Sequence, residues 1–298
     1  MIHSSKHTSN PVVAIDGGGT RCRLALRNGC ADAVVELGSA NVTTDFDAAI
    51  SEISRGLGLL GARAGIEMAE LISLPAYVGL AGVAGPSVAK DVAEALPFTH
   101  IRVEDDRPSA LVGALGARDG VVAHCGTGSF LAAQINGDRR FAGGWGPVLG
   151  DPASAQWVGR RGLTLTLDAV DGICAHTAYS QHVLDKLSGA AGVVQFASTA
   201  RPADFGALAP AITAYAAKGD ALARQVVQEA ANSIAELLPI LGWKPGMAIC
   251  LTGGIAPQYA SYLPDDMQSC VTAPAGEPLS GALSLAQSFS EEIAHEHL

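Results

Sequence analysis

The sequence has little positive charge with which to attract an anionic polymer. Nineteen Lys and Arg residues stand against 29 Asp and Glu residues, which gives a formal net charge of −10. Charged residues make up only 16% of the 298 residues and aromatic residues 5%, whereas 48% are hydrophobic. This composition argues against disorder, coiled coil and collagen, and it predicts a folded protein. Without an overall positive field we expect no nucleic-acid partner, and any phosphate must be bound by local groups.

The cysteines lack the spacing of a metal site. No C-x-x-C pair and no Cys/His set at zinc spacing occurs, so we expect reduced, mostly structural thiols. The six are scattered along the chain: Cys22, Cys30, Cys125, Cys174, Cys250 and Cys270. Residues 1–10 lack the apolar core of a signal peptide, and no apolar run reaches the roughly 18 residues of a membrane span. We therefore expect a cytoplasmic protein with no membrane partner.

Short apolar runs that stop at glycine recur along the chain, which is typical of α/β proteins. The length suggests about two domains at roughly 150 residues each. Apolar patterns predict strands at 11–16, 21–27, 34–37, 76–80 and 100–104, and helices at 45–64, 86–96 and 108–116. The strand at 21–27 is expected to be half-buried, because Arg21, Arg23 and Arg27 alternate with apolar side chains.

A second strand that runs into a glycine turn begins at residue 120. Its hairpins are predicted from the strands 120–124, 130–135 and 139–142. Because a β-hairpin around a Gly/Thr turn thus appears twice, the sequence suggests two related α/β halves. From residue 153 onward we expect mostly helix, with helices at 210–217 and 220–241, the second of which is broken near its end by Pro239. A strand at 247–251 and a closing helix at 278–294 complete the prediction.

Asp16 and Thr20 flank three consecutive glycines at the end of the first strand. Gly17, Gly18 and Gly19 let backbone N–H groups approach a phosphate, and Thr20 can donate to the same phosphate. Asp16 can hold Mg²⁺ through water. The alternative is an ordinary glycine hairpin, which needs at most two glycines and gains nothing from the flanking Asp and Thr.

Small and hydroxyl residues also follow the first strand of the second hairpin, in the order Gly126, Thr127, Gly128 and Ser129. Two such loops suggest a pair of hairpins that close on one polyphosphate. No Gly-Lys-Ser/Thr occurs, and Cys22 takes the place of the last glycine of G-x-G-x-x-G. Neither a P-loop nor a Rossmann motif is therefore predicted.

Three adjacent acids, Glu104, Asp105 and Asp106, end a predicted strand. An α/β sheet places catalytic groups at such ends. A phosphoryl acceptor hydroxyl needs a carboxylate that orients it and accepts its proton. The alternative is a solvated acidic loop.

A long glycine loop over 143–151 carries Trp145 and ends in Asp151. A carboxylate on a close-approach loop suits recognition of vicinal sugar hydroxyls, although Asp151 can also simply N-cap the following helix. The amide of Asn41 suits a hydroxylated ligand and equally a turn. We expect Trp145 and Trp157 to pack the wall of the site rather than to stack on a base.

Gly253 and Gly254 follow the last predicted strand and provide a third place where backbone can approach a ligand, here a purine. A plain strand-to-helix turn is the alternative. His124 and Cys125 lie next to the second loop, and without partners at ligand spacing they are interpreted as buried strand-end residues.

The ordered set of these motifs resembles the N-acetylglucosamine kinase and glucosamine kinase family. That family belongs to the activator-ATPase group of the acetate and sugar kinase, heat-shock-protein and actin superfamily. The segments that carry the resemblance are VAIDGGGTRCRL, GSAN, VGLAGV, VEDDRPSALVGA, AHCGTGSF, GGWGPVLGD and ICLTGGIAP. PADFGALAPAITAYAAKGDALA looks most like the bacterial glucosamine kinase branch.

The resemblance implies an α/β fold of two ribonuclease-H-like domains around a central cleft. Residues 1–112 with 280–298 form the first domain, to which the C-terminal helix returns, and 113–279 form the second, with a helical insertion. ATP is expected on Gly17, Gly18, Gly19, Thr20, Gly126, Thr127, Gly253 and Gly254, with Mg²⁺ organised by Asp16. Sugar contacts are expected at Asn41, Asp106, Ser129, Gly144, Trp145, Gly146 and Asp151.

Asp106 rather than Asp105 matches the catalytic base of the family, because it stands four residues before Ala110. The expected activity is ATP- and Mg²⁺-dependent phosphorylation of the 6-hydroxyl of glucosamine or N-acetylglucosamine, by a possible homodimer. One departure concerns the sugar loop, where Pro152, Ala153 and Ser154 replace the Glu-Gly-Ser common in N-acetylglucosamine kinases. The alternatives are an activator ATPase of a reductase or dehydratase and a non-catalytic sugar-sensing protein.

Overall fold

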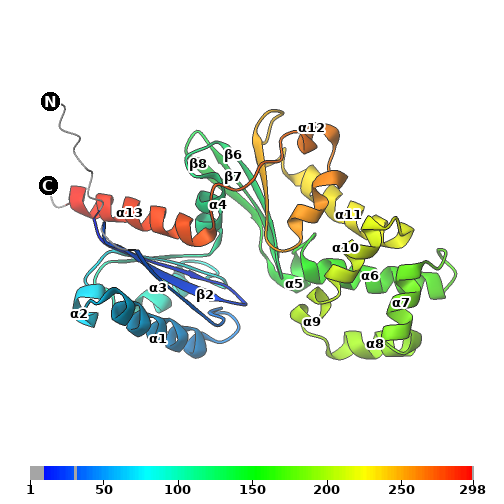
Figure 1. Ribbon diagram of the computed structural model, residues 1–298, viewed down its shortest axis with the longest axis horizontal. Coiled ribbons are helices and arrows are strands. Elements are labelled where there is room, and N and C mark those ends of the chain that lie inside the picture. The colour runs from blue at the N-terminus through cyan, green and yellow to red at the C-terminus, as the bar shows by residue number, and fades with distance from the viewer. Residues whose placement is uncertain (1–9, 30–31, 297–298) are drawn as a thin grey trace. The chain divides into compact units, whose positions relative to one another are not determined.

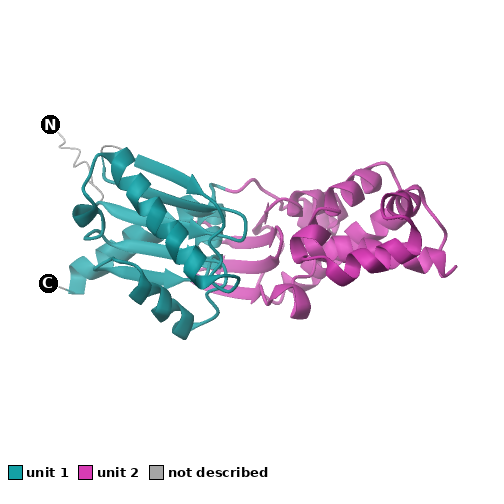
Figure 2. Cartoon of the chain, turned by 90° about the horizontal axis from the view of Figure 1, so that it is seen from below, with its two compact units in different colours: residues 1–117, 275–298 teal, residues 118–274 magenta. Residues whose placement is uncertain are grey.

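The computed structural model describes residues 10–29 and 32–296 (Figure 1). The expectations for Cys30 and for most of the polar N-terminal segment lie outside these residues. The chain divides into two compact units, residues 1–117 with 275–298 and residues 118–274 (Figure 2). Within the part of the chain that is described, no helix has both the length and the apolar character needed to cross a bilayer.

The first unit is built on a five-stranded sheet of order β3-β2-β1-β4-β5. β1 pairs antiparallel with β2 and β2 with β3, whereas β1, β4 and β5 run parallel. The strands are β1 (Val12–Gly17), β2 (Cys22–Arg27), β3 (Asp32–Leu37), β4 (Ala76–Leu80) and β5 (Ile101–Glu104). These are the strands that the apolar patterns predicted, to within one or two residues at most of their ends.

Helices cover both faces of this sheet, as Figure 1 shows for α13 on one side and α1 to α3 on the other. Val13 and Ile15 of β1 pack toward α1, whereas Val12 and Ala14 pack toward α13. This is the two-face alternation of a strand buried on both sides. The helices are α1 (Phe46–Ala64), α2 (Met68–Leu71), α3 (Pro86–Ala95), α4 (Arg107–Leu115) and α13 (Pro278–Glu296).

The expectation of a half-buried second strand is wrong. Ala25 lies in the core beneath α13, and Arg23, on the same face of β2, is only 6% exposed. The alternation of arginine and apolar residues predicted a solvent-facing side, but the C-terminal helix returns and covers it. A buried arginine therefore stands in the sheet next to the first glycine loop.

The second unit contains a four-stranded sheet of order β8-β7-β6-β9. Its two antiparallel pairs and one parallel pair repeat the order β3-β2-β1-β4 of the first sheet. The strands are β6 (Gly120–Cys125), β7 (Ser129–Ile135), β8 (Asp138–Gly143) and β9 (Ala248–Thr252). The sequence-based prediction of two related α/β halves is confirmed by this shared topology.

The rest of the second unit is mostly helical, as expected from residue 153 onward. Its helices are α5 (Gly146–Leu149), α6 (Ala155–Val170), α7 (Ala178–Lys186), α8 (Gly189–Thr199), α9 (Pro202–Gly206), α10 (Ala209–Ala217), α11 (Ala221–Leu237), the 3₁₀ helix η1 (Ala256–Tyr262) and α12 (Asp265–Gln268). The break expected near Pro239 is confirmed, because α11 ends at Leu237 and Pro239 has no N–H for a continuing helix.

Candidate active site

The first glycine loop closes the β1–β2 hairpin and leaves open space beside two of its glycines. A Cβ on Gly19 would meet nothing within 4 Å, and one on Gly18 would meet only the carbonyl oxygen of Arg21 at 3.7 Å. Neither residue has a positive φ, so backbone conformation does not require glycine there. Gly17 differs, because a Cβ there would overlap the side chain of Leu80. The N–H of Gly18 donates to the carbonyl oxygen of Arg21 at 2.9 Å, so the open backbone at Gly19 is the part of this loop that can approach an anionic group.

Asp16 lies at the end of β1, directly before this loop and opposite Arg23 of β2 in the strand register. Its Oδ2 accepts a hydrogen bond from Arg23 Nη2 at 2.8 Å. Burial raises the pKa of Asp16 above its ordinary value, while Arg23 acts in the opposite direction. The residue was predicted as the organiser of Mg²⁺; its pairing with a buried arginine was not.

The donor set around Asp16 fits a magnesium ion that is carried by a nucleotide. Among residues 10–29 and 32–296, no group of three or more His, Cys, Asp or Glu side chains could hold a metal by itself. Mg²⁺ usually keeps several waters and binds through one or two carboxylates plus substrate phosphates. A single carboxylate next to an open glycine loop provides that arrangement.

The three consecutive acids between β5 and α4 have three different environments. Glu104 Oε2 accepts a hydrogen bond from Tyr77 Oη at 2.7 Å. Asp105 accepts from Arg107 through the backbone N–H, Nε and Nη2, at 2.8–2.9 Å. Asp106 is the N-cap residue of α4, but its side chain makes no capping hydrogen bond. The alternative of a solvated acidic loop therefore does not describe this segment.

Asp106 is the acid with the most perturbed protonation. Burial, followed by the charges of Asp105 and Asp16, raises its pKa to about 6. The charge of Asp16 contributes to the raised pKa of Asp106, so the predicted metal carboxylate and the predicted base interact electrostatically. A buried carboxylate with a pKa near the working pH is suited to accept a proton from a hydroxyl group.

Asn41 serves as a turn residue. Its Oδ1 accepts hydrogen bonds from the backbone N–H groups of Thr43 at 3.0 Å and Thr44 at 3.1 Å. This geometry confirms the turn interpretation, in which an amide oxygen takes the place of a backbone carbonyl.

The second glycine loop, between β6 and β7, is packed against Asp151. A Cβ on Gly128 would lie 2.8 Å from Asp151 Oδ2, whereas one on Gly126 would meet only His124 Nε2 at 3.5 Å. Thr127 is exposed at the tip of the loop. Thr127 thus presents the accessible edge of the loop, and Gly128 gives room to the Asp151 carboxylate. The N–H of Gly126 already donates to the carbonyl oxygen of Gly128 at 2.9 Å.

Asp151 is buried, at 4% exposure, and has a left-handed φ of 58°. Its carboxylate accepts hydrogen bonds from the backbone N–H of Gly146 and of Ser129. The N-cap alternative is wrong, because the helix α6 is capped by Ser154, whose Oγ accepts from the N–H of Trp157 at 3.3 Å. Asp151 instead holds the sugar loop against the second glycine loop.

Further backbone and side-chain bonds complete this cluster in the second unit. Gly144 donates its N–H to the carbonyl oxygen of Ser129 at 3.0 Å, and Ser129 Oγ donates to the carbonyl oxygen of Pro152 at 2.6 Å. The structure thus brings together Ser129, Gly144, Gly146 and Asp151, which the resemblance grouped as sugar contacts.

Trp145, in the same loop, does not pack a wall. Trp145 is 74% exposed, and Val148 and Leu149 in the same loop are each 87% exposed. Trp157, by contrast, packs against the core of the second unit. The packing expected of Trp145 is therefore wrong, whereas Trp157 is packed, with neighbours that belong to the hydrophobic core.

The third glycine turn is built onto the second loop. Gly253 has a φ of +83°, and a Cβ there would overlap the backbone of Cys125, whose carbonyl oxygen accepts the N–H of Ile255 at 3.1 Å. A Cβ on Gly254 would meet nothing within 4 Å. Gly253 is therefore required by the fold, and Gly254 is the residue that leaves its backbone accessible.

His124, at the end of β6, lies between the second glycine loop and the third glycine turn. Its Nδ1 lies 3.1 Å from Thr252 Oγ1, and its ring stacks on Phe130 at 5.0 Å between centroids. Burial lowers its pKa to about 4, so the imidazole is neutral near pH 7. Both residues lie at the end of β6 as interpreted, with Cys125 buried and His124 partly buried.

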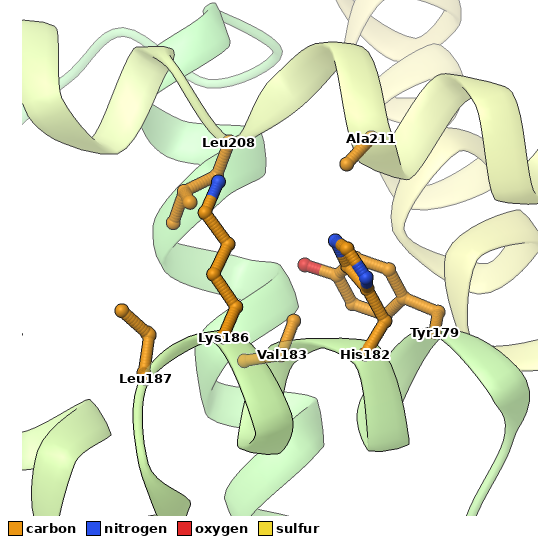
Figure 3. Close-up of a pocket in the computed structure, with 7 residues that line it drawn as sticks. All are labelled: Tyr179, His182, Val183, Lys186, Leu187, Leu208 and Ala211. Carbon is orange, nitrogen blue, oxygen red and sulfur yellow. The ribbon is translucent and has the colours of Figure 1, made fainter.

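A small cavity elsewhere in the second unit contains none of the predicted site residues (Figure 3). It lies between α7 and the start of α10, and Tyr179, His182 and Lys186 provide its polar groups. Its volume of about 10 Å³ has room for a single water molecule. This cavity is too small to be a substrate site.

The two sheets of matching order, each with a glycine loop after its first strand, define an actin- and hexokinase-like ATPase fold. The chain belongs to the BadF/BadG/BcrA/BcrD ATPase family, whose model matches residues 13–275.

Several sugar kinases are similar to this chain in sequence or structure. The chain is 30% identical to glucosamine kinase GspK of Vibrio cholerae, over 93% of this chain and 96% of that protein. It is 24% identical to the N-acetylmuramic acid/N-acetylglucosamine kinase of Clostridium acetobutylicum, over 86% and 89%. A solved structure of a candidate N-acetylglucosamine kinase from Chromobacterium violaceum superposes with a TM-score of 0.82 at 28% identity, over 94% of this chain and 99% of that one.

Proposed function

We propose that this protein is an ATP-dependent amino-sugar kinase that phosphorylates the 6-hydroxyl of glucosamine or N-acetylglucosamine. The names of the similar proteins support the substrate class. The observation that carries the chemistry is Asp106, a partly buried carboxylate with a pKa of about 6 that follows β5, in the same unit as Asp16 and the open glycine loop.

The reaction needs a base, a phosphate cradle and charge neutralisation. Asp106 accepts the proton of the sugar hydroxyl as the new O–P bond forms and the bond to the ADP oxygen breaks. In the first unit, the backbone N–H of Gly19 and the hydroxyl of Thr20 donate to the phosphate oxygens, whereas the N–H of Gly18 already donates to the carbonyl oxygen of Arg21 at 2.9 Å. Asp16 would hold Mg²⁺ through water, and the bound ion would supply positive charge against the phosphates.

In this proposal the sugar is held by the loop cluster of the second unit, which contains Ser129, Gly144, Gly146 and Asp151. Asp151 is already fixed by two backbone N–H groups, so its carboxylate is oriented before any hydroxyl arrives. The backbone of Gly254 is the open surface against which we place the purine. Pro152 replaces the Glu that is common at this position in N-acetylglucosamine kinases. The preference of the enzyme for an amino or an acetamido group at carbon 2 of the sugar must therefore be measured.

The test is a coupled ADP-release assay with glucosamine, N-acetylglucosamine, glucose and mannosamine as acceptors. Sugar-dependent ADP release with one of the first two, and a 6-phosphate product identified by NMR, is the expected result. ATP hydrolysis that no sugar stimulates, together with an iron–sulfur absorbance band after anaerobic purification, would instead indicate an activator ATPase. Sugar binding by calorimetry without any ADP release would indicate a sensor.

A further inference from the structure

Arg23 is a buried charge that the phosphoryl-transfer scheme leaves unused. It stands in the middle of β2, directly opposite Asp16, and donates to Asp16 Oδ2 at 2.8 Å. A second guanidinium nitrogen pairs with Glu277 Oε2, and Nε has no hydrogen-bond partner among the described residues. Glu277 is 254 positions further along the chain and directly precedes α13.

Filling space does not explain this residue. The neighbouring positions on the same face of the sheet are Val12, Ala14 and Ala25, which pack beneath α13 as an apolar layer. A buried guanidinium must recover its desolvation cost from its partners, and an apolar side chain of similar volume is often as stable or more so. The arginine is therefore better explained by what it does to Asp16 than by what it adds to the core.

The pairing limits how the Asp16 carboxylate can be oriented. Arg23 engages Oδ2 in a cross-strand pair, which leaves Oδ1 as the oxygen for a metal-bound water. Partners that fix a carboxylate near a metal determine its orientation and so the affinity of the site. A carboxylate without such a partner would have to be ordered each time the nucleotide binds.

Glu277 connects Arg23 to the helix that carries Asp106. Its carbonyl oxygen accepts the N–H of Ser280 at 2.9 Å and of Gly281 at 3.2 Å, in the first turn of α13. A Cβ on Gly113 of α4 would overlap this carbonyl, so the two helices approach without a side chain between them. Glu277 is thus fixed to α4, whose N-cap residue is Asp106.

We infer that Arg23 is a positioning residue that orients Asp16 toward the metal of the bound nucleotide, with Glu277 as its anchor on the α4–α13 pair. The inference deepens the proposed function and rests on it for the role of Asp16. It assigns no contact between Arg23 and the substrate. Since the Glu277 side chain is mostly exposed, its charge is screened and its effect is smaller than that of Arg23.

The experiment measures ADP affinity by calorimetry, with Mg²⁺ and then with EDTA, in the wild-type protein and four variants. For Arg23→Met we expect the gain in affinity from Mg²⁺ to fall by about tenfold, the lower end of the effect of removing such a partner. Affinity without metal should stay within about twofold, because phosphate donors at the glycine loop are untouched. Arg23→Lys should retain more of the Mg²⁺-dependent gain than Arg23→Met, because the ammonium keeps the positive charge but lacks the planar, two-pronged donor geometry of the guanidinium.

Two further variants complete the test. Glu277→Gln removes the anchor charge and should lower the Mg²⁺-dependent gain by about threefold, as expected for an exposed partner. Arg27→Met is the matched control, because Arg27 lies on the same face at the other end of β2 and pairs with Asp32 at 3.7 Å. It should leave both affinities unchanged.

An unchanged Mg²⁺-dependent gain in a folded Arg23→Met protein would overturn the inference. If that variant does not fold, wild-type gains in both Arg23→Lys and Glu277→Gln would overturn it equally. If the ADP affinity of the wild-type protein is the same with Mg²⁺ and with EDTA, that result contradicts both the metal role of Asp16 and this inference. A normal Mg²⁺ gain that depends on Arg23, without phosphorylation of any sugar, contradicts the proposed sugar kinase function alone.

Discussion

Arg107 engages both carboxylate oxygens of Asp105, through its backbone N–H and Nε to Oδ1 and through Nη2 to Oδ2. The neighbouring Asp106 has no comparable side-chain partner in the capping geometry of α4. Two adjacent acids of the same sequence motif therefore differ in availability. The structure favours Asp106 over Asp105 as the group that meets a substrate hydroxyl, which is the assignment that the resemblance implied.

This difference predicts opposite phenotypes for two isosteric variants. Asp106→Asn should lower kcat by about 10²–10⁴, the usual contribution of a general base, with nucleotide affinity near wild type. Its thermal stability at pH 7 should be at or above that of the wild type, because the amide removes a charge that burial disfavours. Asp105→Asn should lower stability by about 1 kcal/mol through weaker bonds to Arg107, with a smaller effect on kcat. Steady-state kinetics and thermal unfolding check both, and a nearly active Asp106→Asn would contradict the assignment.

The pKa of Asp106 predicts the pH dependence of both rate and stability. Because the proton must be absent for the base to act, kcat should fall as pH drops below about 6. The folded protein holds this proton more tightly than the unfolded chain, whose Asp has the ordinary value of 3.8. The stabilisation from the protonated form is therefore complete below pH 3.8 and is lost as pH rises through about 6.

The control for the pH experiment is Asp106→Asn. Its unfolding free energy, measured by urea titration at several pH values, should lack the part of the decline between pH 4 and 6 that Asp106 causes. A variant whose pH profile of stability coincides with that of the wild type would show that Asp106 is not buried with a raised pKa.

The loop glycines fall into two groups, those at which the fold excludes a side chain and those at which a side chain would fit but would block a ligand. Gly253→Ala should destabilise the protein by more than about 1 kcal/mol, since a positive φ and the Cys125 backbone both exclude a side chain. Gly19→Ala should leave stability unchanged or raise it by about 0.4–1 kcal/mol, because its φ is compatible and its space is open.

The same pair separates stability from binding. Gly19→Ala should raise KM for ATP, because a methyl group would occupy the open side of the loop where phosphate is placed. Thermal unfolding and ATP-dependent kinetics on both variants are the measurements. Wild-type ATP kinetics in Gly19→Ala would argue that the first loop is only a hairpin.

The strands and helices could be predicted closely, because their signals are local. β4 occupies the predicted residues 76–80, and α1 begins after the N-cap residue Asp45 as its apolar spacing indicates. The predictions that proved wrong concern long-range covering. The pattern around Arg23 predicted a solvent-facing side of β2, but α13 covers it, and Trp145 was expected to pack but is 74% exposed.

The sequence by itself determined where backbone can come close to a ligand, because a glycine run after an apolar strand allows few other structures. It also determined the order of motifs by which the family is recognised. Only the tertiary structure decided which of those glycines remain open, which acid is free of an arginine, and that Arg23 links Asp16 to Glu277. These properties depend on contacts between residues far apart in the chain, and local patterns of charge and hydrophobicity carry no record of such contacts.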